Sequence, residues 1–263
     1  MTRSEVTAAK RIVVKVGSSS ISGANTQTLP LIVDALAATH TRGVEVVLVS
    51  SGAIASALPF FGLESRPTDD LVTEQAAAAV GQTILMDRYR DALRPHDIVG
   101  AQILMTASDF DNESTRVNAT AALSKLLELR FLPIVNENDT VATHEIRFGD
   151  NDRLASLVAT LLHADVLVLL SDVDALYSKP PQAPGAAKID FVTHEDDLAG
   201  IEIGGNASLV GTGGAETKIQ AARHATDNGI PVILTSAANV AGALNGDEVG
   251  TWFEAAPTVG NLD

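Results

Sequence analysis

The sequence contains no cysteine. This absence excludes disulfide bonds, thiolate metal sites and a cysteine nucleophile, and it fits a reducing compartment. The first ten residues, MTRSEVTAAK, include no apolar stretch of signal-peptide length, and the longest apolar runs are too short to span a membrane. We therefore expect a cytoplasmic protein.

Positive charge and aromatic side chains are also scarce. Eighteen Lys and Arg residues stand against 33 Asp and Glu, a formal net charge of -15, which repels nucleic acid and anionic membrane surfaces. An anionic ligand would need a few placed lysines, backbone N–H groups at helix starts or a divalent cation. Because aromatics make up 4% and apolar residues 46% of the chain, the core must consist mainly of Ala, Val, Leu and Ile.

Two common nucleotide-binding signatures are missing. The chain has no G-x-x-x-x-G-K-[ST] phosphate loop, and no G-x-G-x-x-G follows its first predicted strand. These absences argue against a P-loop enzyme and against a Rossmann dinucleotide-binding protein. Any phosphate site must be built from other residues.

Apolar runs alternate with segments of helical periodicity along the chain. We predict strands at 11–16, 44–49, 98–104, 131–135, 166–170 and 232–234, and helices at about 28–41, 70–93 and 115–129, from about 150, and after Gly214. Strands separated by helices predict a mainly parallel sheet covered on both faces, with ligands beyond the carboxyl ends of the strands. The segment 179–185 contains three prolines and should form an exposed loop.

Small and polar residues follow several predicted strands. Lys15 precedes Gly17 and three serines, so its ammonium and nearby backbone N–H donors could bind a phosphate. The alternative is a lysine on an edge strand followed by a serine-rich turn, with no ligand. Ser51 and Gly52 lead from the second strand into a helix, whose first N–H groups could bind a carboxylate or phosphate. The alternative is a capped helix start that binds no ligand.

Two clusters of Asn and Asp come next, at 136–139 (NEND) and at 149–152 (GDND). Asp150 is a plausible N-cap for the apolar helix that follows it, which explains one of these acids. The remaining residues exceed what turns require, and they suit recognition of an ammonium group.

The second half of the chain adds two further segments. Ser171 and Asp172 follow the most apolar strand, and a glycine-rich turn at 211–214 enters a helix with Lys218 near its start. Glycine lets backbone approach a phosphate, and the lysine would add a mobile positive charge; a flexible loop is the alternative.

Together these segments resemble the amino-acid-kinase family. The matching motifs run in order through nearly the whole chain as VVKVGSS, SSGAIA, VGQ at 80–82, VNENDTVA, FGDNDRLAS, LLSDVDALY and GTGGAETK. The NEND and GDND pair is most similar to members that act on glutamate. The resemblance implies a carbamate-kinase-like α/β fold, a three-layer αβα sandwich around a mainly parallel sheet. It would form one domain over 1–263, with an amino-acid lobe at about 1–164 and an ATP lobe at about 165–263.

The resemblance further implies ATP-dependent phosphorylation of the γ-carboxylate of L-glutamate, the first step of proline biosynthesis. Lys15 and Lys218 would neutralise the transferring phosphoryl group, and Asp152 would hold both lysines. The implied glutamate contacts are Ser51, Gly52, Asp139 and Asn151, with Asp139 receiving the α-ammonium. The implied ATP contacts are Lys15, Gly17, Ser171, Asp172, Thr212, Gly213, Gly214, Ala215, Glu216, Thr217 and Lys218.

Several expectations about ligands and partners follow from the same resemblance. Mg²⁺ would be coordinated by the ATP phosphates rather than by a metal site of the protein. The chain would self-associate as a dimer or tetramer, respond to proline as a feedback inhibitor, and hand its product to a glutamyl-phosphate reductase. A glutamate carboxylate is already ionised at pH 7, so the absence of a catalytic His or Cys is expected.

Three features depart from the family pattern. Ala215 stands where methionine is usual, and Ser171 where threonine is common; we expect ATP binding to survive both, with an altered nucleotide affinity. The chain stops soon after 251–253 without a C-terminal PUA domain, as in a short-form enzyme or a shortened chain. The alternatives are a family kinase acting on N-acetylglutamate, aspartate, carbamate or UMP, and a non-catalytic sensor of glutamate or proline.

Overall fold

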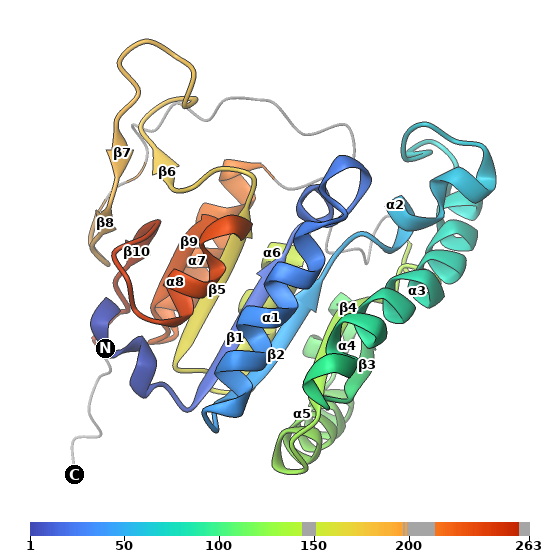
Figure 1. Ribbon diagram of the computed structural model, residues 1–263, viewed down its shortest axis with the longest axis horizontal. Helices are drawn as coiled ribbons and strands as arrows, with labels where there is room; N and C mark the ends of the chain where they lie inside the picture. Colours follow the sequence, from blue (N-terminus) through green and yellow to red (C-terminus); the bar gives the residue numbers. More distant parts are fainter. Residues whose placement is uncertain (144–150, 197, 199–213, 258–263) are drawn as a thin grey trace.

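A central sheet organises the computed structural model, which describes residues 1–143, 151–196, 198 and 214–257. Eight strands of this described part form one sheet in the order β3-β4-β2-β1-β5-β9-β10-β8 (Figure 1). The strands are β1 (Arg11–Val16), β2 (Glu45–Ser50), β3 (Gly100–Met105), β4 (Leu132–Glu137), β5 (Val166–Ser171), β8 (Phe191–Val192), β9 (Val232–Ser236) and β10 (Thr251–Phe253). A separate antiparallel ribbon pairs β6 (Leu176–Tyr177) with β7 (Lys188–Ile189).

Six neighbouring strands, from β3 to β9, are parallel to one another. Only the far end of the sheet breaks the pattern among the described strands, because β10 runs antiparallel to β9. β4 and β5 are buried along their whole length, as is typical of parallel strands covered on both faces. The carboxyl ends of the parallel strands therefore meet at one edge, as the sequence predicts.

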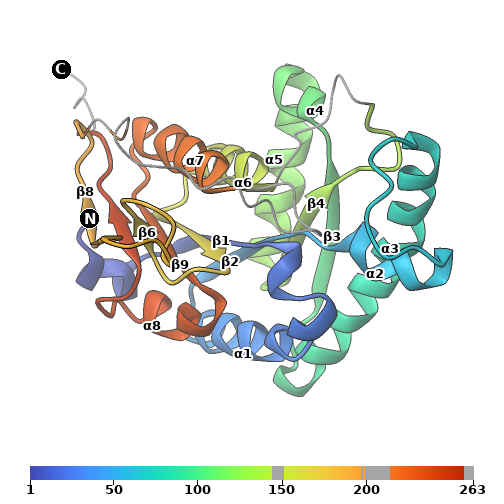
Figure 2. The ribbon, with the colours of Figure 1, turned by 90° about the horizontal axis from the view of Figure 1, so that it is seen from above.

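Helices cover both faces of the sheet. They are α1 (Thr28–Thr41), α2 (Ala53–Ala57), α3 (Leu71–Leu93), α4 (Ala107–Asp111), α5 (Glu113–Glu128), α6 (Asn151–Leu161), α7 (Ala215–Asp227) and α8 (Val240–Leu244). Short 3₁₀ segments lie at Arg3–Ala8, Ser18–Ser20, Gly23–Asn25, Leu58–Phe61, Arg94–His96 and Ala237–Asn239. Figure 2 shows α1, α3 and α8 on one face and α5, α6 and α7 on the other. Two separate apolar cores fill these layers, which confirms the three-layer αβα prediction.

The alternation of side chains along β1 decides which residues face which layer. Ile12, Val14 and Val16 belong to the core beneath α1, whereas Val13 belongs to the core beneath α6 and α7. Because successive side chains of a strand point to opposite faces, Lys15 lies on the same face as Val13. This register places the Lys15 ammonium under α6 and α7.

Side-chain caps begin two of the long helices, α3 and α5. The Asp70 carboxylate accepts a hydrogen bond from the backbone N–H of Thr73 at 3.1 Å and caps α3. The Asn112 side chain does the same for α5, through the N–H of Thr115 at 3.0 Å. These polar residues satisfy N–H groups that a helix leaves without internal partners.

Gly81 in the VGQ motif has a packing role. A Cβ atom at this position would lie 1.8 Å from the backbone oxygen of Ala53, which no structure tolerates. Only glycine therefore lets α3 pack this closely on α2. Since α2 begins directly after Ser51 and Gly52, this contact fixes the turn that follows β2.

The predicted elements agree closely with the structure. The ranges 11–16 and 28–41 match β1 and α1, and the other complete ranges differ by one or two residues at an end. The segment 179–185 is a largely exposed loop between β6 and β7, as predicted. Strands β6, β7, β8 and β10 were not predicted because they span only two or three residues. None of the helices in the described part is long and apolar enough to cross a bilayer.

Candidate active site

Three predicted residues form a buried ion cluster beyond the end of β1. The Lys15 ammonium lies 2.5 Å from Oδ1 of Asp152, and the Lys218 ammonium lies 3.0 Å from its Oδ2. Asp152 is fully buried, Lys15 is 3% exposed and Lys218 is 8% exposed. Lys15 comes from β1, Asp152 from the first turn of α6 and Lys218 from the first turn of α7. We call these three residues the lysine–aspartate triad.

The triad carries more positive than negative charge. Burial alone would raise the pKa of Asp152, but the neighbouring Lys15 and Lys218 together outweigh it and lower the pKa below its ordinary value. The carboxylate is therefore ionised at neutral pH and compensates one of two ammonium groups. The remaining positive charge makes this edge of the sheet suitable for an anion.

Glycines line the space beside the triad. A Cβ atom at Gly17 would lie 3.7 Å from the Lys15 ammonium, so the glycine leaves that side of the ammonium open. Gly52 has a φ of 95°, a left-handed conformation that glycine adopts without strain, and a Cβ there would lie 3.6 Å from Cα of Ser18. The turns after β1 and β2 therefore lie side by side.

Asn151 joins the ends of two strands. Its side-chain Nδ2 lies within hydrogen-bond distance of three acceptors: the backbone oxygen of Ser50 at 2.6 Å, Oγ of Ser51 at 2.9 Å, and Oδ1 of Asn136 at 2.7 Å. Two of the predicted glutamate contacts, Asn151 and Ser51, are thus in direct contact. Because Asn151 immediately precedes Asp152, the same turn of α6 also carries the centre of the triad.

Asp139 lies after β4, where an arginine approaches it. Nη2 of Arg66 is 3.9 Å from Oδ1 of Asp139, and Nε of the same side chain bonds to Oε1 of Glu74. Glu74 is fully buried in the first turn of α3. Neither Arg66 nor Glu74 was predicted as a site residue. A signal existed for Glu74, because it shares the buried face of α3 with Ala77, Ala78 and Gly81.

A second contact that the sequence did not indicate supports the turn after β2. The Tyr89 hydroxyl of α3 lies 2.8 Å from Oγ of Ser50, which in turn lies 3.1 Å from the backbone oxygen of Ser51. Tyr89 is 1% exposed, and burial raises the pKa of its hydroxyl far above any physiological pH. It therefore remains a neutral hydrogen-bond donor.

The predicted ATP segments are described in part. Ser171 ends β5 and bonds to the exposed Asp172, with 3.1 Å between Oγ and Oδ1. Gly214 precedes α7, whose first turn holds Ala215, Glu216, Thr217 and Lys218, with Oγ1 of Thr217 at 3.2 Å from Oδ2 of Asp152. Thr212, Gly213 and the predicted helix cap Asp150 lie outside the described residues.

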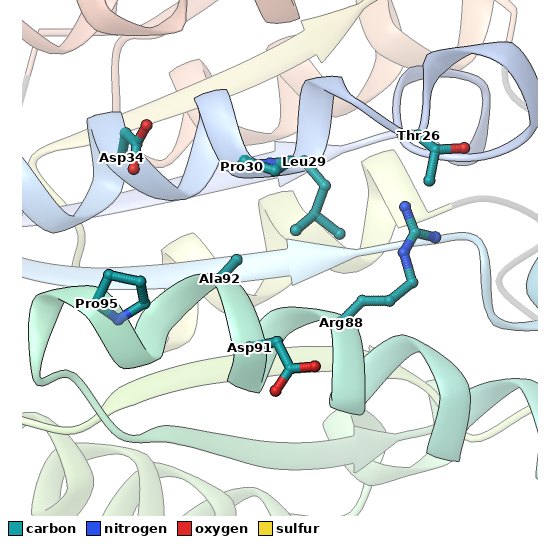
Figure 3. A pocket seen from close by; sticks show the side chains of 8 residues that line it. All are labelled: Thr26, Leu29, Pro30, Asp34, Arg88, Asp91, Ala92 and Pro95. Carbon is teal, nitrogen blue, oxygen red and sulfur yellow. The ribbon is translucent and has the colours of Figure 1, made fainter.

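A groove between α1 and α3 is separate from these residues. It has a cavity volume of about 460 Å³ and is lined by Thr26, Leu29, Pro30, Asp34, Arg88, Asp91, Ala92 and Pro95 (Figure 3). The groove lies in the layer opposite α6 and α7 and includes no predicted site residue. Within the described ranges, no group of three or more His, Asp or Glu side chains could hold a metal ion.

Comparison with known proteins places this geometry in context. Residues 10–236 match the model of the amino acid kinase family. The chain is 60% identical over 251 residues to a glutamate 5-kinase of Clavibacter sepedonicus, covering 95% of this chain and 96% of that relative. A glutamate 5-kinase of Leifsonia xyli is 60% identical over 252 residues, covering 95% and 93%. One from Thermobifida fusca is 53% identical over 257 residues, covering 96% of this chain but 66% of the relative.

Solved structures show the same fold at low sequence identity. A carbamate kinase from Giardia lamblia bound to AMP-PNP has a TM-score of 0.68 at 19% identity, covering 95% of this chain and 100% of that one. An isopentenyl phosphate kinase has a TM-score of 0.64 at 18% identity, covering 92% and 99%. Both likenesses concern the fold alone.

Proposed function

The chain belongs to the amino acid kinase family, and on this premise we propose that it catalyses the reaction of a glutamate 5-kinase. It transfers the γ-phosphoryl group of ATP to the γ-carboxylate of L-glutamate and forms L-glutamyl 5-phosphate for proline biosynthesis. The observation that carries the proposal is the buried lysine–aspartate triad at the carboxyl ends of the parallel strands. The 60% identity to glutamate 5-kinases over 95% of the chain supports the choice of substrate.

The proposed chemistry needs no general base. A glutamate side chain ionises near pH 4.3, so a carboxylate oxygen can attack the γ-phosphorus directly while the bond to the leaving ADP oxygen breaks. The main obstacle is repulsion between two anions. Lys15 and Lys218 reduce that repulsion from two sides, and Asp152 holds both ammonium groups in fixed positions.

Glutamate binding is assigned to the turns after β2 and β4. Asp139 receives the α-ammonium, while Ser51, Gly52 and Asn151 contact the substrate beside the triad. The hydrogen bonds of Asn151 support this role, because they fix Ser51 next to Asp152. Gly17 and Gly52 provide backbone N–H donors close to the reacting atoms.

ATP binding is assigned to the second half of the chain, in an ATP lobe at about 165–263 opposite an amino-acid lobe at about 1–164. Lys15, Gly17, Ser171, Asp172 and the segment 212–218 are the proposed contacts. The start of α7 supports this assignment, because its N–H groups and helix dipole favour an anion. When bound, Mg²⁺ would neutralise phosphate charge, and its ligands would be mainly phosphate oxygens and water.

Further expectations concern the setting of the enzyme. We propose a cytoplasmic dimer or tetramer that is inhibited by proline and passes its product to a glutamyl-phosphate reductase. Light scattering with and without proline measures both self-association and its response to the inhibitor. A mass of one chain under both conditions would contradict the oligomer.

A substrate comparison tests the proposed function. The enzyme, ATP and Mg²⁺ are incubated with either L-glutamate or N-acetylglutamate, and hydroxylamine traps any acyl phosphate as a hydroxamate. We expect product from glutamate only, because acetylation removes the charge that Asp139 would pair with. Turnover of the acetylated compound alone would contradict the assignment, and glutamate binding without ATP consumption would indicate a sensor.

A further inference from the structure

We propose that Arg66 is a specificity-determining residue that binds the α-carboxylate of the amino acid substrate, next to the α-ammonium bound by Asp139. The inference rests on the proposed function, since it assigns the second charged group of the same substrate. Arg66 lies in the loop between the 3₁₀ segment Leu58–Phe61 and α3, outside every motif of the family resemblance. Its role follows from its contacts.

Glu74 anchors the Arg66 side chain. The anchor uses Nε of the guanidinium, and Glu74 is buried in the packed face of α3, so its own position is fixed. A guanidinium has five N–H donors, and a bond through Nε leaves donors on Nη1 and Nη2 for another acceptor. An arginine held in this way is already oriented for a carboxylate, which reduces the entropy lost on binding.

The spacing of Arg66 and Asp139 suits a zwitterion. Their closest atoms, Nη2 and Oδ1, are 3.9 Å apart, beyond the usual 2.7–3.2 Å of an N–H···O hydrogen bond. The two side chains are 19% and 12% exposed, so both are partly accessible to solvent. An α-amino acid carries its ammonium and carboxylate on one carbon, and each would meet the opposite charge on this pair.

A chain of contacts connects the pair to the triad. Asp139 follows β4, whose Asn136 is tied through Asn151 to the turn after β2, and Asn151 adjoins Asp152. The start of α3 is held to the segment after β4, because Nε2 of Gln75 in α3 donates to the backbone oxygen of Ala142 at 3.1 Å. A head group at Arg66 and Asp139 can therefore direct its γ-carboxylate toward the triad.

Three substrates that differ by one group test the proposal. L-Glutamate carries both head-group charges, 4-aminobutyrate lacks the α-carboxylate, and glutarate lacks the α-ammonium. Each keeps a carboxylate that can be phosphorylated. In the Arg66→Met variant we expect the preference in kcat/KM for glutamate over 4-aminobutyrate to fall about 10- to 100-fold, the range of a lost charged hydrogen bond. The preference for glutamate over glutarate should stay within about 3-fold of the wild-type value, because both compounds retain the affected carboxylate.

Matched variants separate binding from structure. The double variant Arg66→Met with Glu74→Gln removes the buried acid that the single change would leave without its arginine. The variant Asp139→Asn should show the opposite pattern, with a reduced preference for glutamate over glutarate and an unchanged preference over 4-aminobutyrate. Arg66→Lys keeps the charge and provides the comparison if the methionine variants do not fold.

An equal loss of kcat/KM for all three compounds in the double variant would overturn the proposal and leave Arg66 as a structural partner of Glu74. Failure of the wild-type enzyme to phosphorylate glutamate would instead overturn the proposed function. Calorimetry of the same three compounds measures the effect of the Arg66→Met change on binding without turnover. Loss of the preference for glutamate over 4-aminobutyrate supports the proposal, and an unchanged preference contradicts it.

Discussion

Two charged clusters in this molecule differ in burial, geometry and sign. The lysine–aspartate triad joins two cations to one anion, has contacts of 2.5 and 3.0 Å, and is almost completely buried. The second cluster, formed by Arg66, Glu74 and Asp139, joins two anions to one cation and includes a loose contact of 3.9 Å between partly exposed side chains. The positive charge of the triad suits a phosphoryl group, whereas Arg66 and Asp139 offer one cation and one anion to the two head-group charges of an amino acid.

The two clusters also differ in the elements that carry them. The triad stands on β1, α6 and α7, elements that pack against one another, which suits stabilisation of a short-lived transition state. The second cluster stands largely on connecting segments, where a substrate can enter and leave. Changes in the triad should therefore act on the rate of phosphoryl transfer, and changes in the second cluster on substrate affinity.

The largest expected effect is that of Asp152→Asn. Loss of the carboxylate removes the negative charge that the two buried ammonium groups share, so kcat should fall by about 100- to 1,000-fold while glutamate affinity changes little. Steady-state kinetics and calorimetric binding of glutamate measure the two quantities. The matched control is Glu128→Gln, which removes an exposed ion pair with Lys125 and should leave both unchanged. An unaltered kcat in Asp152→Asn would refute the division of tasks.

A smaller effect of another kind is expected for Asp139→Asn. The variant should raise the KM for glutamate about 10- to 100-fold, with kcat within a few-fold of wild type, because the lost interaction is made equally in the ground and transition states. Kinetics at saturating ATP give both values. If kcat fell and KM did not change, Asp139 would belong with the triad rather than with the head group.

The Tyr89→Phe variant tests whether the hydrogen bond between Tyr89 and Ser50 supports the turn after β2. Removal of the hydroxyl deprives Oγ of Ser50 of a buried partner and should cost about 1 kcal/mol in the free energy of unfolding. Urea denaturation measures this loss, and KM for glutamate should rise only a few-fold. Tyr177→Phe is the control, because that hydroxyl bonds to Asp174 at an exposed position and its loss should change little. An equal loss in the free energy of unfolding for Tyr89→Phe and Tyr177→Phe would show that the buried hydroxyl does not stabilise this turn.

The smallest expected effect is the change with pH in the stability difference between wild type and Asp152→Asn. The pKa of Asp152 is lower in the folded than in the unfolded protein, where it is near 3.8, so its ionised form stabilises the fold above that value. The free-energy difference between wild type and Asp152→Asn should thus be constant from pH 7 to pH 5. It should shrink only as the pH falls below about 3.8 toward the folded pKa. Urea denaturation at a series of pH values measures it, and a decline between pH 7 and 5 would indicate a raised pKa.

The sequence predicts the first cluster better than the second. A valine-rich run that ends at Gly17 predicts β1, and the family resemblance singles out Lys15, Asp152 and Lys218 before their contacts are known. Arg66 lies in no motif, and its approach to Asp139 brings a residue that precedes α3 to one that follows β4. Such a contact between distant residues follows from packing rather than from local pattern.

Oxygen transfer from substrate to phosphate would show whether the glutamate carboxylate attacks the γ-phosphorus of ATP. L-Glutamate labelled with oxygen-18 in its γ-carboxylate is incubated with the enzyme, unlabelled ATP and hydroxylamine, and the released inorganic phosphate is analysed by mass spectrometry. If a carboxylate oxygen attacks the γ-phosphorus, hydroxylamine frees phosphate that carries one labelled oxygen and leaves the other in the γ-hydroxamate. We predict this transfer; phosphate without label would show attack by water and contradict the account.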